Sequence, residues 1–219
     1  MKIVVIADDL TGAAEVAGAA LRFGLTAEVQ IGRIDASAAD VVVIDADSRS
    51  LNADAATATV LELTMQSLEL QPDAVFKKVD SLLRGPVAAE IAAMRAAGKF
   101  QQCLLVCGNP RKRRTVVGGK IFIDNVPLHQ TRFANDPEHP CHTDQIAELL
   151  TDCGAIEIGD ASNASDLQAH AKHWFSRRTT MLAAGGAEFF EAVLAVCVAA
   201  DHPNHELRPV IDAGITPLQ

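Results

Sequence analysis

Three polar clusters in this sequence combine residue types that bind small anions and hydroxyl groups. They are DDLTG at residues 8–12, KKVDSLLRG at residues 77–85 and NPRKRRT at residues 109–115. Arg and Lys side chains bind carboxylates and phosphates, whereas Asp side chains accept hydrogen bonds from hydroxyl groups. If the fold brings the clusters together, they form a pocket for a small polyhydroxy anion. Taken singly, each cluster is equally consistent with solvated charges at the end of a strand or the start of a helix.

Two adjacent carboxylates, Asp8 and Asp9, follow an apolar run and enter a turn of small residues. Thr11 is the predicted N-cap of the next helix, and Gly12 allows close approach of the backbone. The carboxylate nearest the helix start gains from the helix dipole, so it is expected to stay ionised and to accept hydrogen bonds from substrate hydroxyls. The sequence does not decide which of the two this is. A phosphatase or phosphotransferase with an aspartate nucleophile and Mg²⁺ is disfavoured, because such enzymes need an Asp-x-Asp arrangement.

Short apolar runs alternate with segments of helical period, which predicts an α/β fold. Strands are expected over residues 2–7, 27–31, 40–45, 74–78, 103–107, 155–158 and 181–184. Helices are expected over residues 12–23, 53–70, 87–97, 143–150, 164–174 and 187–199, with Gly98 as a C-cap. The expected fold is Rossmann-like, with a mainly parallel sheet and helices on both faces. Ligands of such sheets gather beyond the carboxyl ends of the strands, where all three polar clusters fall.

The segment from residue 108 to residue 141 breaks the alternation and is predicted to be a long loop insertion that bears a hairpin. It contains Gly118-Gly119, a strand over residues 120–123 and a turn at Asp124-Asn125. Loops of this length within a domain are usually functional or disordered. One domain is expected over residues 1–200, and residues 201–219 are expected to form a tail or linker.

Composition narrows the classes of function. With 219 residues, 49% of them hydrophobic, the chain can bury a single core. Its net charge of −9 argues against nucleic-acid binding. No apolar stretch reaches the roughly 18 residues of a membrane span, so a cytoplasmic protein without membrane contact is expected. Five cysteines without a Cys-x-x-Cys pair predict free thiols, and the run of residues 138–142 (EHPCH) lacks the spacing of a metal site.

The motifs together resemble those of the four-carbon acid sugar kinase family, in its N-terminal, substrate-binding domain. The matching stretches occur in the family's order: ADDLTGA at residues 7–13, KKVDSLLRG at 77–85 and RTVVGGKIFIDNVPLHQTRFANDPEHP at 114–140. Asp160, Asp166 and the run AAGGA at residues 183–187 resemble the family's closing strand and glycine-bearing turn. The resemblance, with the cluster positions, assigns a substrate site to Asp8, Asp9, Lys78, Asp80, Ser81, Arg84, Arg114 and Asp136.

The resemblance implies one half of a two-domain kinase that transfers the γ-phosphoryl group of ATP to a hydroxyl of a threonate- or erythronate-type acid. ATP and Mg²⁺ would be bound by a nucleotide-binding domain that has no counterpart in this sequence. The expected partners are a small sugar acid, a separate nucleotide-binding domain and, in a homo-oligomer, further copies of the chain. The alternative is a stand-alone sugar-acid-binding or regulatory domain without phosphoryl transfer.

Some positions depart from the family's pattern. Leu82 stands where the family usually carries Thr, Pro86 stands where Asn is usual, and residues 111–113 (RKR) are more basic than usual. The loss of two hydrogen-bonding side chains beside Arg84 is expected either to alter substrate choice or to mark a decayed site. Arg84 itself is expected to be an exposed residue at a strand end, whose replacement by alanine abolishes acid binding and leaves the fold near wild type.

Overall fold

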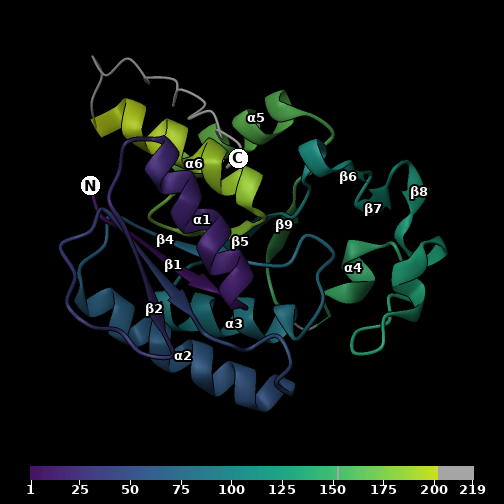
Figure 1. The fold of residues 1–219 in the computed structure, drawn as a ribbon, viewed down its shortest axis with the longest axis horizontal. Helices are drawn as coiled ribbons and strands as arrows, with labels where there is room; N and C mark the ends of the chain where they lie inside the picture. Colours follow the sequence, from purple (N-terminus) through teal and green to yellow (C-terminus); the bar gives the residue numbers. More distant parts are fainter. Residues whose placement is uncertain (152, 202–219) are drawn as a thin grey trace, which may run out of the picture.

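A seven-stranded sheet in the order β2-β3-β1-β4-β10-β5-β9 forms the centre of the molecule (Figure 1). Every strand pair in it is parallel. The computed structural model describes residues 1–151 and 153–201. The strands are β1 (Ile3–Ala7), β2 (Ala27–Ile31), β3 (Val41–Asp45), β4 (Ala74–Lys78), β5 (Gln102–Val106), β9 (Ile156–Ile158) and β10 (Met181–Gly185). The predicted α/β fold is confirmed.

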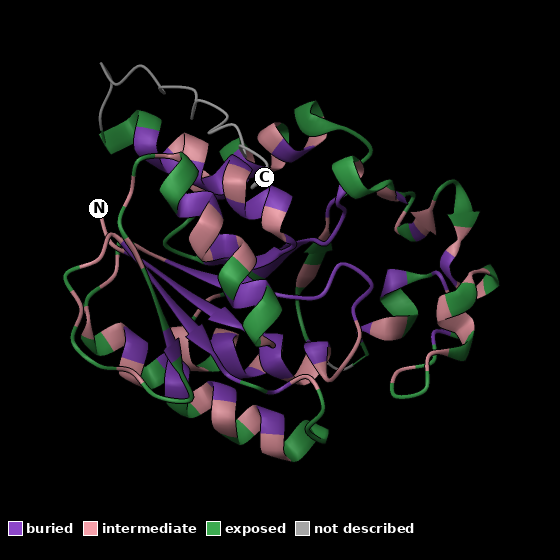
Figure 2. Ribbon diagram, in the orientation of Figure 1, coloured by how far each residue is buried: buried purple, intermediate pink, exposed green. Residues whose placement is uncertain are grey.

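Helices cover both faces of the sheet, as Figure 1 shows. One face carries α1 (Leu10–Arg22), α5 (Ala164–Phe175) and α6 (Ala187–Asp201), and the other carries α2 (Ala53–Glu69) and α3 (Val87–Gly98). The central strands are therefore buried on both sides, and Figure 2 shows them as a purple layer between helices with exposed outer faces. This double burial explains why the strands are continuous apolar runs rather than alternating ones.

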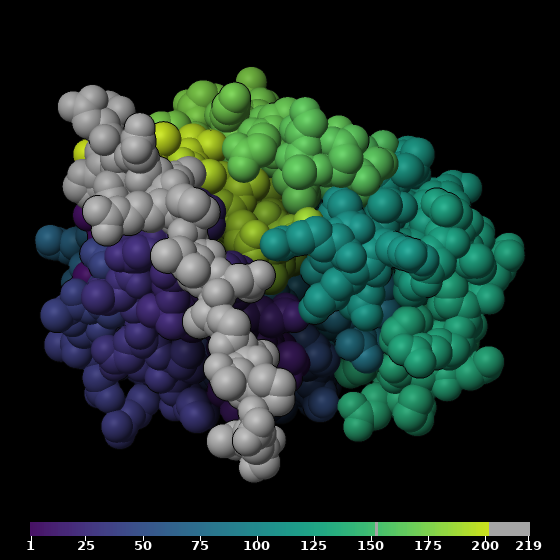
Figure 3. All heavy atoms as spheres, turned by 45° about the horizontal axis from the view of Figure 1, so that its top comes forward, coloured from purple at the N-terminus to yellow at the C-terminus, as the bar shows by residue number. Residues whose placement is uncertain are grey.

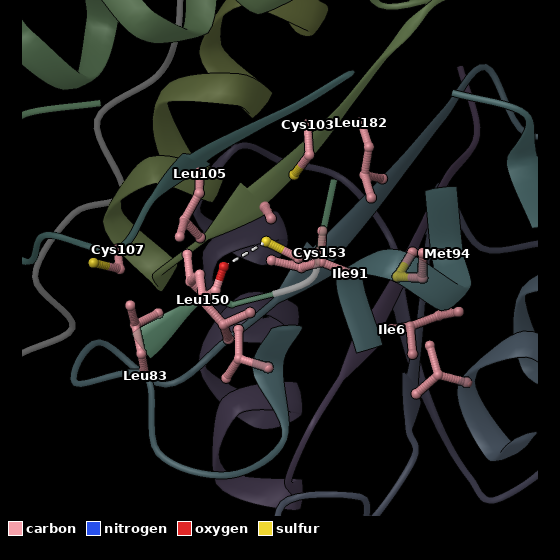
Figure 4. Close-up of a cluster of buried hydrophobic side chains, with 14 of the residues drawn as sticks. Ile6, Leu83, Ile91, Met94, Cys103, Leu105, Cys107, Leu150, Cys153 and Leu182 are labelled. Atoms are coloured by element: carbon pink, nitrogen blue, oxygen red, sulfur yellow. Dashed lines mark hydrogen bonds between the residues drawn. The ribbon is translucent and has the colours of Figure 1, made fainter. Parts of the chain in front are cut away.

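The sheet divides the core into two hydrophobic clusters, because successive side chains of a strand point to opposite faces. Ile3 and Val5 of β1 belong to the cluster that contains Trp174 of α5 and Phe189 of α6. Ile6 belongs to the other cluster, which α2 and α3 complete and part of which Figure 4 shows; its labelled members include Ile91, Met94, Cys103, Leu105 and Leu182.

The insertion lies at one end of the sheet and forms a small antiparallel sheet of its own (Figure 1). Its elements are η1 (Pro110–Lys112), β6 (Arg114–Val117), β7 (Lys120–Ile123), β8 (Val126–Pro127), η2 (Leu128–Gln130), η3 (Arg132–Asn135) and α4 (Ile146–Leu149). Val116 and Ile121 are fully buried in the same cluster as α3. The Asp160 carboxylate accepts hydrogen bonds from the amides of Gly118 (2.5 Å) and Gly119 (2.9 Å). The predicted hairpin is thus fixed to the rest of the domain by buried side chains of β6 and β7 and by the bonds of its turn to Asp160.

Three sequence-based boundaries were wrong. The N-cap of α1 is Asp9, not Thr11, because the Asp9 side chain accepts a hydrogen bond from the Gly12 amide and the helix begins at Leu10. The C-cap of α3 is Lys99 in the left-handed region, at φ 55°, so Gly98 is the last helical residue. The helix predicted over residues 143–150 shortens to α4, because the stretch before it pairs with β7 and its turn: the Asp144 carbonyl accepts from the Ile121 amide, and the Ile146 amide donates to the Gly119 carbonyl.

The cysteines form no disulfide among the described residues, and Cys103, Cys107, Cys141 and Cys197 are buried free thiols. Burial raises the pKa of the Cys107 thiol to about 12. None of the helices in the described part of the chain combines the length and apolarity of a membrane span. In the predicted tail or linker, residues 202–219 lie outside the described residues.

Candidate functional site

The loops that follow β1, β3, β4, β5 and β10 meet beyond the carboxyl ends of these strands and enclose a cavity of about 180 Å³. Figure 3 shows the purple N-terminal segment, the yellow α6 and the teal insertion meeting on one face of the molecule. The cavity is lined by Asp9, Thr11, Gly12, Glu15, Arg49, Lys78, Asp80, Ser81, Arg84, Asn109, Lys112, Arg114, Gly186 and Ala187. Charged side chains dominate this lining, so the cavity suits a small polar ligand.

Arg49, in the loop after β3, holds both carboxylates of the loop after β1. Its Nε donates to Asp8 Oδ2 at 2.7 Å, and its Nη1 donates to Asp9 Oδ2 at 2.7 Å. Burial opposes the charge of Arg49, but the carboxylates of Asp8, Asp80 and Asp9, with Asp8 foremost, outweigh it and raise the pKa of Arg49. Asp8 is fully buried, so it lies beneath the cavity, whereas Asp9 lines it. The two adjacent carboxylates thus have different tasks: Asp8 anchors Arg49, and Asp9 faces the cavity.

Asp9 also starts α1, and the small residue after it makes room for Lys78. The Gly12 amide donates to Asp9 Oδ1 at 2.8 Å. A Cβ atom at Gly12 would lie 2.8 Å from Asp9 Oδ1 and 2.8 Å from Lys78 Nζ. Such distances are shorter than any normal contact, so only glycine at this position allows the ammonium group and the carboxylate to occupy this corner.

Lys78 is the last residue of β4 and is only 4% exposed. Its Nζ donates to the Val79 carbonyl at 3.0 Å. Burial lowers the pKa of Lys78, although the negative charges of Asp8, Glu15 and Asp9 partly offset this. Within the described part of the chain no carboxylate lies at ion-pair distance from its ammonium group. A buried cation without such a partner is poised to bind an anion.

The loop after β4 makes a second ion-pair cluster. Arg84 Nε donates to Asp80 Oδ2 at 2.8 Å, and Arg84 Nη1 donates to Asp136 Oδ2 at 3.3 Å. Burial opposes ionisation of Asp80, but the hydrogen bonds and charge of Arg84 prevail and hold the pKa of Asp80 below its usual range. Arg84 is only 24% exposed. The expectation of an exposed Arg84 was therefore wrong, because both ends of its guanidinium are bound to carboxylates.

The insertion supplies the remaining wall of the cavity. Arg114, the first residue of β6, donates from Nη1 to Ser81 Oγ at 2.5 Å. The guanidinium carbons of Arg84 and Arg114 lie 5.8 and 5.9 Å from the centroid of the Phe133 ring, which is within the range of a cation–π contact. Among the described residues Arg114 has no carboxylate partner, in contrast to Arg84. Phe133 thus packs against Arg84 and Arg114 as well as its neighbour Arg132, and of the two that line the cavity Arg114 remains available to an anion.

Most of the predicted site residues come together in this cavity. Those that line it are Asp9, Lys78, Asp80, Ser81, Arg84 and Arg114. Asp8 lies beneath the cavity, and Asp136 lies behind Arg84 with its Oδ1 bound to the amides of Glu138 and His139. Both hydrogen bonds lower the pKa of Asp136, and the bond from the His139 amide has the larger effect.

Sequence reasoning missed Arg49 and named Asn109 and Lys112 only as parts of a basic run. The signal for Arg49 was present, because it follows the strand over residues 40–45 just as the three polar clusters follow theirs. Two of the departures from the family's pattern, Leu82 and Pro86, do not line the cavity, whereas Lys112 of the third departure does. Leu82 is fully buried in the core, and Pro86 is the residue before α3. Leu82 and Pro86 therefore make no direct contact with the cavity through which they could alter substrate choice.

A family model described as a sugar-binding N-terminal domain matches residues 3–190. The chain belongs to this family. It is 35% identical to a D-threonate kinase of Salmonella typhimurium (strain LT2) over 153 residues, which is 68% of this chain and 36% of that protein. It is 31% identical to a D-erythronate kinase of Heliobacterium modesticaldum over 172 residues, which is 76% of this chain and 39% of that protein. A 3-oxo-tetronate kinase of Methylobacterium radiotolerans is 29% identical over 66% of this chain and 36% of its own length.

Solved structures share the fold of this sugar-binding N-terminal domain. A Bordetella bronchiseptica protein, crystallised with bound citrate as a domain-swapped dimer, superposes with a TM-score of 0.81 at 25% identity. The match covers 91% of this chain and 58% of that protein. A Haemophilus influenzae protein at 21% identity has the same fold, with a TM-score of 0.81. The chain thus spans 36 to 39% of the kinases and 58% of the citrate-bound protein named above.

Proposed function

We propose that this chain is the acid-sugar-binding half of an ATP-dependent kinase that phosphorylates a four-carbon sugar acid of the threonate or erythronate type. The observation that carries the proposal is a pair of cations, Lys78 and Arg114, that line the cavity without a carboxylate partner among the described residues. The kinases that this chain resembles are named for threonate, erythronate and 3-oxo-tetronate. Each of these compounds carries one carboxylate that such a pair could bind.

The other cations of the cavity are already engaged. Arg49 is bound to Asp8 and Asp9, Arg84 is bound to Asp80 and Asp136, and Lys112 lies 2.6 Å from Glu15. An incoming carboxylate that displaced these pairs would have to break interactions of similar strength. Lys78 and Arg114 need no such exchange, so they are the two cations of the cavity best placed to bind one carboxylate.

The polar groups around this pair suit hydroxyl groups. Asp9 is partly exposed at the cavity and has one bonded hydrogen on each oxygen, which leaves a lone pair on each for a substrate hydroxyl. The Ser81 hydroxyl accepts from Arg114 and can donate its own hydrogen to the ligand. A ligand with one carboxylate and several hydroxyl groups thus finds partners for both kinds of group.

We assign ATP and Mg²⁺ to a companion nucleotide-binding part, because the related kinases extend well beyond the region that this chain matches. No three metal-ligating side chains gather as a metal site within residues 1–151 and 153–201. The contribution of this chain to phosphoryl transfer is to hold the acceptor hydroxyl in place and to exclude alternative orientations, which is a large part of such catalysis.

A stand-alone sugar-acid-binding or regulatory domain is the second candidate. Such a domain would need only the cavity described above and no nucleotide-binding part. The geometry disfavours the third candidate function, a phosphatase or phosphotransferase that uses an aspartate nucleophile. Asp8 is fully buried, and each oxygen of Asp9 already accepts one hydrogen bond, from Arg49 and from the Gly12 amide, which lowers the nucleophilicity of this carboxylate.

Calorimetric titration with D-threonate and D-erythronate tests the proposal. Wild type is expected to bind at least one of them, and Lys78→Met and Arg114→Met are each expected to weaken binding about 10- to 100-fold, the equivalent of a charge-assisted hydrogen bond. Arg113→Met is the matched control, because Arg113 is 80% exposed and pairs with Asp124 away from the cavity. Wild type that binds neither acid, or variants that bind as wild type does, would refute the site.

Turnover separates the two candidate functions. A mixture of this chain, ATP, Mg²⁺, the bound acid and a nucleotide-binding part from a related kinase is expected to release ADP. Binding without turnover in this mixture favours the stand-alone domain.

A further inference from the structure

A fully buried charged network lies beneath the cavity, on the opposite side of β4 from Lys78. Its members are Lys77 of β4, Glu90 of α3 and Ser48 of the loop after β3, and all three are 0% exposed. Lys77 Nζ lies 3.1 Å from Glu90 Oε2, and the Ser48 hydroxyl donates to Glu90 Oε1. Neighbouring residues of a strand point to opposite faces, so Lys77 enters this network while Lys78 enters the cavity.

Stability alone does not account for this network. The desolvation penalty of a buried ion pair offsets most of its attraction, and apolar residues of similar volume are often at least as stabilising. The Lys77–Glu90 contact is also not an aligned hydrogen bond, since both of its charged atoms lack a hydrogen-bond partner. A buried polar network that contributes little to stability is more readily understood through the geometry that it imposes on its neighbours.

The network ends at the loop that carries Arg49. The amides of Ser48 and Arg49 both donate to the Asp8 carbonyl, at 3.0 and 3.2 Å. The Ser48 hydroxyl fixes the other side of this loop to Glu90. Gly85 packs against the same loop, because a Cβ atom there would lie 2.7 Å from the Arg49 carbonyl oxygen. The Arg49 backbone is thus held from three directions, by the loop after β1, by α3 and by the turn before α3.

We propose that Glu90 is a positioning residue, which acts through Ser48 to hold Arg49 in the orientation that presents Asp9 to the ligand. The chain of contacts runs from Lys77 through Glu90 and Ser48 to Arg49, and from Arg49 to Asp9. The effect on ligand affinity rests on the proposed sugar-acid-binding function. The effect on Arg49 does not, because it concerns the chain without ligand.

The first test follows Arg49 directly. In wild type its Nε–H, bonded to Asp8 and partly buried, should give a resolved resonance that exchanges slowly with solvent. Ser48→Ala removes the bond to Glu90 and is expected to speed this exchange at least tenfold, and Ser48→Cys keeps the volume should the alanine variant fold poorly. The matched control is Ser67→Ala, because Ser67 is equally buried but bonds to the Thr64 carbonyl within α2. An unchanged Arg49 resonance in a folded Ser48 variant would overturn the proposal.

The second test is a double-mutant cycle on ligand affinity. Ser48→Ala is expected to raise the Kd for the sugar acid about tenfold, yet to have no further effect in an Arg49→Ala background, because it acts through Arg49. Effects that multiply in the double variant would overturn the proposal. If wild type binds no sugar acid, the proposed function fails, and the Arg49 resonance still decides whether Glu90 positions Arg49.

Discussion

Replacement of Arg84 by alanine should destabilise the domain, although Arg84 lines a cavity. The change leaves the Asp80 carboxylate, whose side chain is 8% exposed, without its guanidinium partner. Breaking a fully buried ion pair costs about 3–5 kcal/mol, because one charge remains buried and uncompensated. Since Arg84 itself is 24% exposed, a loss of about 2–3 kcal/mol in the free energy of unfolding is expected. For a chain of this size that corresponds to a fall of about 4–12 °C in Tm.

The loss should depend on pH, with a sign that follows from Asp80. In wild type the pKa of Asp80 is held below its usual range, so the pair stabilises the fold above the unfolded value of about 3.9 and the benefit fades as pH falls. In the variant, burial is no longer opposed by Arg84 and raises the pKa of Asp80. Protonation of Asp80 in the variant then removes the free-energy cost of its uncompensated buried charge. The difference between the two proteins should be largest near pH 7 and should shrink towards pH 4.

Urea denaturation at several pH values measures this difference. The control is Arg113→Ala, whose exposed ion pair with Asp124 should contribute less than about 1 kcal/mol. A variant with wild-type stability at pH 7, or a deficit that stays constant from pH 7 to pH 4, would show that Asp80 does not depend on Arg84.

Further predictions concern the corner of the cavity, the core and the hairpin. Gly12→Ala should displace the Lys78 ammonium and weaken sugar-acid binding at least tenfold in a titration, whereas Gly18→Ala in the same helix, where the nearest atom lies 3.9 Å from the new Cβ, should keep binding and add about 0.5–1 kcal/mol of stability. Cys107, with a buried thiol and a pKa of about 12, should resist a thiol reagent at pH 8 until urea unfolds the chain; rapid native labelling would contradict its burial. Asp160→Ala should speed amide exchange at Gly118 and Gly119, and unchanged exchange would mean that the hairpin turn is held by other contacts.

Much of the fold was predictable because its signals are local. Runs such as VVVID are apolar on both faces, as strands of a parallel sheet covered by helices must be. Boundaries were less predictable, because caps depend on which side chain reaches the first free amides. Both Asp9 and Thr11 are good N-cap residues, and only the path of the chain after β1 decides for Asp9.

The candidate site was predictable where charged residues cluster at or soon after the carboxyl end of a strand, as Lys78 does at the end of β4. It was not predictable how those charges pair with one another. Arg84 looked available in the sequence but is engaged by Asp80 and Asp136, residues 4 and 52 positions away. Arg49 looked unremarkable but organises Asp8 and Asp9. Such pairings depend on the register and order of the strands, and the hydrophobic periodicity of the sequence does not reveal either.

The position of β10 between β4 and β5 has a consequence for how the chain matures on the ribosome. β4 and β5 follow one another in sequence yet do not pair, so a slot stays open between them until residues 181–185 have been synthesised. Until then two strand edges in the middle of the sheet are unpaired, which is a state prone to mispairing and aggregation. The cavity also needs Gly186 and Ala187. A ligand of this cavity could therefore recognise the nascent chain only after β10 and the start of α6 have been synthesised and have closed the sheet.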